Sequence, residues 1–169
     1  IRRAFFHNGS MKNSINRRAL LTGFLAALFL PGSARGQNAV NFPKSQLAID
    51  TNEGRKIFDV ELAISDAQQS RGLMFRETMA ADAGMLFDYR FAQRITMWMR
   101  NTLIPLDMIF IGADGRVINV AERTIPHSEA IIASKGRARA VLEVNGGTAS
   151  RLGIKAGTKV YHRIFGTGP

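Results

Sequence analysis

Two carboxylates stand in segments that are otherwise apolar, and they are the residues of this chain best suited to chemistry. Asp107 lies in Pro-Leu-Asp-Met-Ile-Phe at 105–110, and Glu143 lies in Val-Leu-Glu-Val at 141–144. Because alternate residues of a strand share a face, Asp107 is predicted to lie on the face of Ile109. A buried carboxylate without a partner is costly, so we expect Asp107 to have one.

Three arginines and the single tryptophan lie beside similar apolar stretches. A guanidinium can hold a carboxylate through two parallel hydrogen bonds, so Arg71, Arg76 and Arg100 are the expected partners of Asp107. Two outcomes are open: the pairs tie strands together, or the same groups line a cleft that binds a ligand. The candidate ligand-binding residues are Arg71, Arg76, Trp98, Asn101, Asp107 and Glu143.

The sequence indicates catalysis less sharply. A general acid–base pair needs two carboxylates at a defined separation, and Asp107 and Glu143 are the candidates for it. The chain has no Gly-x-Ser-x-Gly turn of the α/β-hydrolases and no glycine-rich segment that matches a phosphate loop. No catalytic residue is therefore assigned.

Composition gives no support for metal or thiol chemistry. The chain has no cysteine, which excludes thiolate zinc sites, thiol nucleophiles and disulfides. His7, His127 and His162 are far apart in the sequence and do not form a His-x-x-x-His motif. The pair at 114–115, Asp-Gly, is typical of a turn and lacks the further acidic positions of a calcium loop. We therefore expect no metal and no cofactor.

The net charge of +10 is concentrated near the beginning of the chain. Residues 1–36 carry six basic residues and no acidic one, which leaves 17 basic and 13 acidic residues in the remainder, a net of +4. Such a surface carries both signs in ordinary proportion. Because it has no basic stripe and no known binding motif, we expect no nucleic-acid partner.

Residues 1–36 also have the pattern of a leader. From Met11, a positive segment with an arginine pair at 17–18 precedes twelve mostly apolar residues at 19–30, and small residues suited to cleavage follow at 34–36. A membrane span needs about 20 apolar residues, so we expect no stable span. The pattern predicts a periplasmic or secreted protein, exported by the general secretory or the twin-arginine route.

The remainder is predicted to form an extended arm over 37–45 and one β-rich domain over 46–165. Short helices are expected after Ser65 and around 149–152. Because strands outnumber helices and connections are short, we expect a mostly antiparallel, curled sheet, either barrel-like or a sandwich. Period-two alternation and turn residues predict strands at 47–49, 57–64, 84–89, 94–99, 105–111, 116–121, 137–144 and 158–165.

Several motifs in these segments, in this order, resemble the bacterial and archaeal domain-of-unknown-function (DUF) family 192. They are Arg71-Gly72-Leu73-Met74-Phe75-Arg76, Gly84-Met85-Leu86-Phe87, Trp98-Met99-Arg100-Asn101-Thr102, Pro105-Leu106-Asp107-Met108-Ile109-Phe110, Asp114-Gly115, Leu142-Glu143-Val144 with Gly146-Gly147, and Gly153-Ile154-Lys155-Ala156-Gly157. The resemblance covers about 46–165 and implies a single β-rich domain, often with an export signal. The family has no established activity, so the resemblance carries over no catalytic residue.

Two functions are open on the sequence. The first is an exported, non-catalytic binding or accessory module, whose cleft takes a small polar ligand, a glycan fragment or a peptide end. The second is a hydrolase of an envelope component, with Asp107 or Glu143 as general base and an arginine that stabilises negative charge. Two carboxylates in one pocket would favour the enzyme, whereas carboxylates capped by arginines or backbone amides would favour a structural role. The oligomeric state is not indicated.

Overall fold

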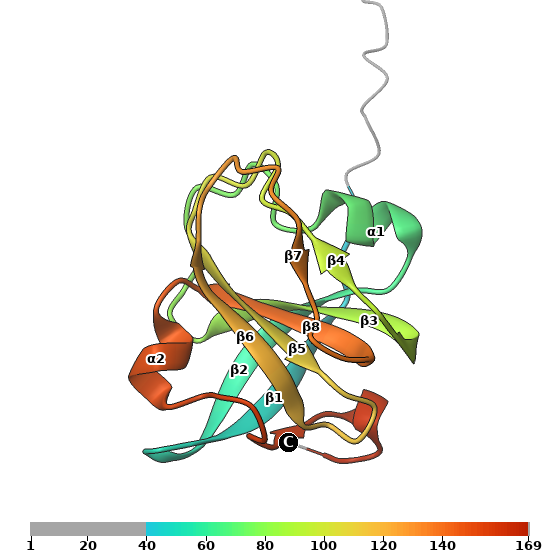
Figure 1. Cartoon of the computed structure of the whole chain (residues 1–169), viewed down its shortest axis with the longest axis vertical. Helices are drawn as coiled ribbons and strands as arrows, with labels where there is room; N and C mark the ends of the chain where they lie inside the picture. The colour runs from blue at the N-terminus through green and yellow to red at the C-terminus, as the bar shows by residue number, and fades with distance from the viewer. Residues whose placement is uncertain (1–39, 169) are drawn as a thin grey trace, which may run out of the picture. The chain divides into compact units, whose positions relative to one another are not determined.

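A computed structural model describes residues 40–168 of the chain. Within this part, seven strands form one sheet in the order β6-β5-β8-β3-β2-β1-β9, and β4 pairs with β7 in a small second sheet (Figure 1). Neighbouring strands are antiparallel except β2 and β3. The strands are β1 (Lys44–Thr51), β2 (Gly54–Ala63), β3 (Ala83–Gln93), β4 (Thr96–Met97), β5 (Leu106–Ile111), β6 (Val117–Thr124), β7 (Ile132–Ala133), β8 (Ala138–Asn145) and β9 (Val160–Tyr161).

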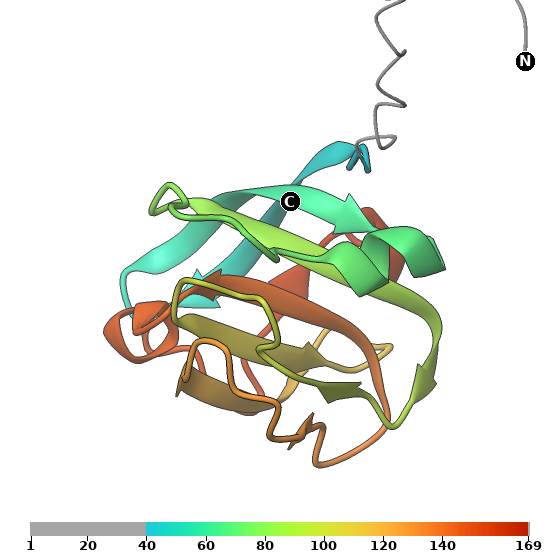
Figure 2. The ribbon, with the colours of Figure 1, turned by 90° about the horizontal axis from the view of Figure 1, so that it is seen from above.

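The predicted curled, mostly antiparallel sheet with short helices is confirmed (Figure 2). Helix α1 (Asp66–Arg71) begins where the sequence predicted it, because Ser65 and Gln68 form a capping box at its N-terminus. Helix α2 (Thr148–Leu152) follows the glycine pair after β8. The hairpins β1–β2 and β5–β6 also lie where turn residues predicted them.

The two edges of the sheet meet near Gly115. The backbone N–H of Val160, in β9, donates to the Gly115 carbonyl over 2.8 Å, and the N–H of Val117, in β6, donates to the Thr158 carbonyl over 2.9 Å. Gly115 has a φ of 73°, and a Cβ added to it would lie 2.8 Å from the Val160 carbonyl oxygen. The position therefore requires glycine both for its backbone conformation and for the close approach of the two edges.

The faces of the sheet pack into two different hydrophobic clusters. Strand β8 contributes to both, because Leu142 and Val144 point into the first cluster while Val141 points into the second. The first cluster is completed by α2 and β9, and the second by the segments 72–79 and 95–104. Period two places Glu143 on the face of the second cluster, together with Val141.

Two strands are shorter than the sequence predicted. The segment at 94–99 pairs with β7 only at Thr96–Met97, because Ile95 and Met99 turn into the second cluster instead of extending the sheet. The segment at 158–165 forms β9 over two residues and then the 3₁₀-helix η1 (Arg163–Phe165). The strand ends at His162 because this residue caps η1: its side chain is buried, and its Nδ1 accepts the Ile164 N–H.

The remaining expectations concern the beginning of the chain. The leader predicted over 1–36 lies outside the described residues. Of the arm predicted over 37–45, residues 40–43 have no regular structure and β1 begins at Lys44. Among residues 40–168, no helix is both long and apolar enough to cross a membrane.

Candidate functional site

A cleft of about 370 Å³ lies over the second cluster, between the C-terminal end of α1, strand β3 and the chain that follows β4. Most of its wall is apolar. The side chains that form this part of the wall are Leu73, Met74, Phe87, Met97, Trp98 and Ile131. Pockets of this size, with apolar walls and few polar groups, are typical of small-ligand sites.

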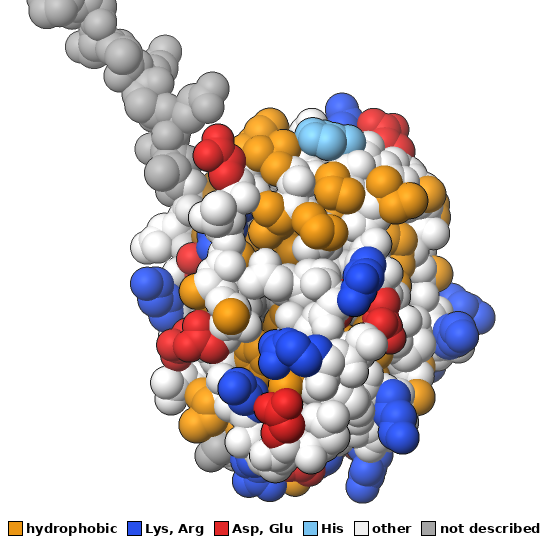
Figure 3. All heavy atoms as spheres, turned by 90° about the vertical axis from the view of Figure 1, so that its left-hand side faces the viewer, with side chains coloured by type: hydrophobic (Ala, Val, Ile, Leu, Met, Phe, Trp, Pro, Cys, Tyr) orange, Lys and Arg blue, Asp and Glu red, His pale blue; other side chains and the backbone are white. Residues whose placement is uncertain are grey.

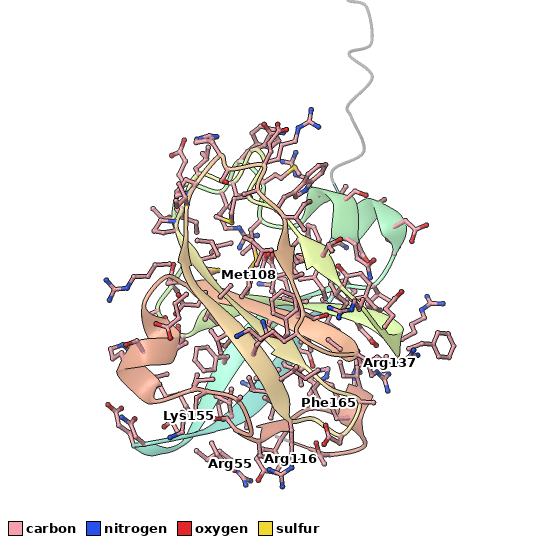
Figure 4. All side chains as sticks on the ribbon, in the orientation of Figure 1. Arg55, Met108, Arg116, Arg137, Lys155 and Phe165 are labelled. Carbon is pink, nitrogen blue, oxygen red and sulfur yellow. The ribbon has the colours of Figure 1, made fainter. Side chains whose placement is uncertain are left out.

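Glu143 is the acidic residue that lines this cleft. It lies near the middle of β8, between Met85 of β3 and Met108 of β5, and Met108 is labelled within the sheet in Figure 4. Only 4% of the Glu143 side chain is exposed, and burial raises the pKa of its carboxyl from 4.5 to about 8. At neutral pH the carboxyl is therefore mainly protonated.

No described residue forms a hydrogen bond or ion pair with the Glu143 carboxyl. Among residues 40–168, every fully buried side-chain nitrogen or oxygen has a partner, so the carboxyl must reach the open space of the cleft. A neutral acid in this position can donate one hydrogen bond and accept others. It is the carboxyl group that lines the cleft.

Tyr89 extends the same face of β3 by one step beyond Phe87. Its hydroxyl donates to the Met97 Sδ over 3.3 Å, which joins β3 to β4 across the cleft. Burial, followed by the negative charge that Glu143 can carry, raises the pKa of the Tyr89 hydroxyl to about 12. The phenol therefore stays protonated and holds the Met97 side chain in the wall.

Two exposed arginines lie at the rim. Arg71, in the last turn of α1, lies over the ring of Phe75 at 4.8 Å, and Arg100 lies over the ring of Trp98 at 5.7 Å. Arg100 also approaches Glu129 at 3.8 Å, with more than half of each side chain exposed. Ion pairs this exposed contribute little, so both guanidinium groups are available to a ligand.

Three loops form the upper end of the domain and support the cleft: 72–76, 98–104 and 125–131, called here the upper loops. The Phe75 N–H donates to the Asn101 carbonyl over 2.9 Å, and the His127 N–H donates to the Thr102 carbonyl over 3.2 Å. Phe75, Asn101 and His127 have φ of 63°, 55° and 60°, a region uncommon for residues other than glycine. Such strain collects at functional sites, where neighbouring contacts maintain it.

The upper loops also expose apolar side chains. Figure 3 shows hydrophobic side chains gathered at this end of the molecule. Phe75 is 54% exposed and Ile125 73% exposed, and Trp98 at the cleft wall is 45% exposed. The cleft therefore opens beside apolar side chains as well as beside the two arginines.

Asp107 does not belong to this site, and the expectation that an arginine compensates it is wrong. Its side chain is fully buried, and its Oδ1 accepts hydrogen bonds from the Arg123 N–H over 2.7 Å and the Gly147 N–H over 2.9 Å. Its Oδ2 accepts from the Ala149 N–H over 2.7 Å. Three backbone amides thus satisfy the carboxylate, which is a structural arrangement that joins β5 and β6 to the start of α2.

The other predicted site residues divide in the same way. Arg71, Trp98 and Glu143 line the cleft together. Arg76 instead pairs with Glu61 of β2 at 2.6 Å, and the Asn101 amide contacts the Met74 Sδ at 3.9 Å behind the wall. The predicted cleft shared by all six residues is therefore wrong for Arg76, Asn101 and Asp107.

Sequence reasoning did not single out Tyr89 or Met97, and it named Arg100 only as a possible partner of Asp107. For Tyr89 a signal existed, because period two puts it on the face of Phe87. Met97 carried no comparable signal, since it precedes Trp98 in a segment that leaves the sheet. Among residues 40–168, no group of three or more His, Asp or Glu side chains could hold a metal ion.

The comparisons with known proteins agree with this fold. The family model DUF192, described as "Uncharacterized ACR, COG1430", matches residues 48–162. A solved protein from Sinorhizobium meliloti 1021, described as a candidate transcription regulator, is 42% identical with a TM-score of 0.71, over 74% of this chain and 98% of that one.

A second solved protein, of unknown function, comes from Novosphingobium aromaticivorans DSM 12444. It is also 42% identical with a TM-score of 0.71, over 74% of this chain and 89% of that one. No curated protein matches the chain. The family model covers most of the domain, and the sequence resemblance to this family is confirmed. The chain belongs to the DUF192 family.

Proposed function

We propose that this domain is a binding module that takes one small ligand into the cleft above Glu143. The observation that carries the proposal is the Glu143 carboxyl, which lines the cleft, reaches its open space and has no ion-pair partner among the described residues. A carboxyl group in an apolar environment lowers the stability of the folded protein. Ionisable groups with perturbed pKa values are common at functional sites. A ligand would provide the hydrogen bond that the fold does not.

Binding would use the two kinds of surface that the cleft offers. The protonated Glu143 donates a hydrogen bond to an acceptor on the ligand, and the apolar wall around Phe87 and Trp98 excludes water from it. Asp107 is fully engaged elsewhere, so the cleft contains one carboxyl group among its lining residues. This supports binding over a mechanism that needs two carboxylates.

The chain carries its own reporter for this proposal. Trp98 is the single tryptophan and lines the cleft, so its emission should change when a ligand enters. We would titrate the protein with small aromatic amides, which offer a ring for the wall and a carbonyl for Glu143. At least one should shift the Trp98 emission in a saturable way, and a panel without any such response would contradict the proposal.

A blocking variant locates the binding. Thr96 is exposed and lines the cleft, so Thr96→Phe should fill its mouth and abolish the response without loss of stability. Glu122→Phe places the same ring on an exposed position of β6 outside the cleft and serves as the control. Equal binding by the Thr96→Phe variant and the wild-type protein would show that the amides bind elsewhere.

A second candidate function is a hydrolase of an envelope component, and the raised pKa of Glu143 favours it. A carboxyl with a pKa of about 8 can act as a general base near physiological pH. The rate of p-nitrophenyl acetate hydrolysis should then rise with pH up to about 8 and level off, and Glu143→Gln should abolish it. A rate that survives this substitution would leave only the binding function.

Export is part of the proposal, and it rests on the leader pattern at 11–36. Expression of the chain from Met11 in a bacterial host should give a periplasmic product whose mass corresponds to cleavage after Ala34 or Gly36. Recovery of the uncut chain in the cytoplasm would contradict it.

A further inference from the structure

The charges that face the cleft are unbalanced. The ionisable acidic and basic side chains that line it are Arg71, Arg100 and Glu143. Glu143 is mainly neutral at pH 7 because burial raises the pKa of its carboxyl, so the two guanidinium groups determine the local charge. A cleft with apolar walls and a positive rim attracts negatively charged ligands.

Neither guanidinium is tightly held by an acidic side chain. Arg71 forms no ion pair with any residue of 40–168, and its described contact is the ring of Phe75. Arg100 approaches Glu129 at 3.8 Å, and both side chains are more than half exposed. A ligand anion could replace so weak an interaction at little cost. Both arginines line the cleft, and neither is held by a strong ion pair among the described residues.

The floor and wall define the other end of the ligand. The Glu143 carboxyl offers a hydrogen-bond donor, and Phe87, Met97 and Trp98 offer apolar contact. We propose that the ligand is an amphipathic anion: an apolar body with an uncharged hydrogen-bond acceptor lies on the floor, and a carboxylate, phosphate or sulfonate group lies between Arg71 and Arg100. This inference rests on the proposed binding function and names the chemical class of its ligand.

A cationic ligand fits the same cleft poorly. It would have to ionise Glu143 in a site where burial opposes the charge, and it would meet two guanidinium groups at the rim. A neutral ligand would bind through the floor and wall alone. The expected order of affinity is therefore anion, neutral molecule, cation.

Three probes with one body test this order. Hippurate, hippuramide and N-(2-aminoethyl)benzamide share a benzamide group, which supplies the apolar ring and the uncharged acceptor, and they differ in a head that is a carboxylate, a primary amide or an amine. We would measure their affinity by Trp98 emission and by calorimetry at pH 7. At low salt the carboxylate should bind about fivefold or more tightly than the amide, and the amine most weakly, with the preference reduced at high salt.

Substitution of the rim arginines tests the cause of the preference. In the Arg71→Gln, Arg100→Gln double variant the preference should be lost, so that hippurate and hippuramide bind with about equal affinity. Arg151→Gln, which changes an exposed arginine on α2 outside the cleft, should alter neither. A preference for the anion that survives the double substitution would overturn the inference.

The failures of the two proposals differ. If all three probes bind equally, or the amine binds most tightly, and Thr96→Phe abolishes their binding, then the cleft is a ligand site and the proposed ligand class is wrong. If none of the three probes binds, or Thr96→Phe has no effect on their binding, then the binding function itself fails and this inference fails with it.

Discussion

Glu143 occupies a position where an apolar residue would stabilise the fold better. Its neighbours across the sheet are Met85 and Met108, and burial raises its pKa to about 8. Because the folded protein retains a proton that the unfolded chain releases above pH 4.5, the free energy of unfolding should fall as pH rises from about 4.5 to about 8. Above that range both forms are ionised and the loss is complete.

The Glu143→Gln variant should therefore be more stable than the wild-type protein at alkaline pH. Glutamine fills the same space without a charge, so we expect a gain of about 3–5 kcal/mol at pH 9 and almost none at pH 4. Urea unfolding at both pH values measures it. Glu77→Gln changes an exposed loop carboxylate and is the control. Equal gains at the two pH values would show that the carboxyl is not protonated in the fold.

Asp107 shows how one side chain connects several elements. Its oxygens accept the N–H groups of Arg123 in β6, Gly147 before α2 and Ala149 within α2. A helix of five residues has little stability of its own, so these bonds fix its position against the sheet.

The Asp107→Asn variant should lose about 2–4 kcal/mol of stability, because an amide group would face backbone donors with one oxygen instead of two. Its affinity for cleft ligands should not change. Chemical unfolding and Trp98 titration separate the two effects, and Asp82→Asn at an exposed loop position is the control. Loss of binding with stability retained would place Asp107 in the site after all.

The elements show which part of the fold can be predicted from sequence. The hairpins and α1 depend on local signals, namely turn residues and a capping box, and these lie where they were predicted. The segments at 94–99 and 158–165 alternate in the same way as strands. Ile95 and Met99 instead pack into the second cluster, whose other members are distant in the sequence. His162 caps η1 locally and also bonds to the distant Ser45.

The candidate site, like the strands, can be predicted from sequence only where the signal is local. Asp107 and Glu143 carry the same sequence signal, an acid in an apolar strand, yet they face opposite sides of the sheet. Residues far along the chain decide their roles: backbone amides at 123, 147 and 149 satisfy Asp107, whereas the upper loops leave the Glu143 carboxyl open to a cleft. A single sequence shows that such residues are unusual and does not show what surrounds them.

At the scale of the whole domain, the closure of the curled sheet depends on a narrow contact. Gly115→Ala would place a Cβ 2.8 Å from the Val160 carbonyl oxygen at a φ of 73°, so we expect a loss of about 2–4 kcal/mol. Gly157→Ala is a matched control, because Gly157 has a φ of 89° with nothing within 4 Å of its added Cβ, and should cost about 1 kcal/mol. Thermal unfolding compares them, and equal losses would show that the edge contact adds nothing.

The alternation of β8 between two clusters has a consequence for how relatives of this protein can diverge. Leu142 and Val144 maintain the enclosed side of the sheet, whereas Val141 and Glu143 face the side on which the cleft lies. Substitutions at Glu143 and at the cleft-lining residues of the upper loops would alter what the protein recognises, whereas Val141 is fully buried in the second cluster and maintains the packing on that side. Ligand specificity and the stability of the fold therefore depend on different residues of the same strand, and evolution can change the first without the second.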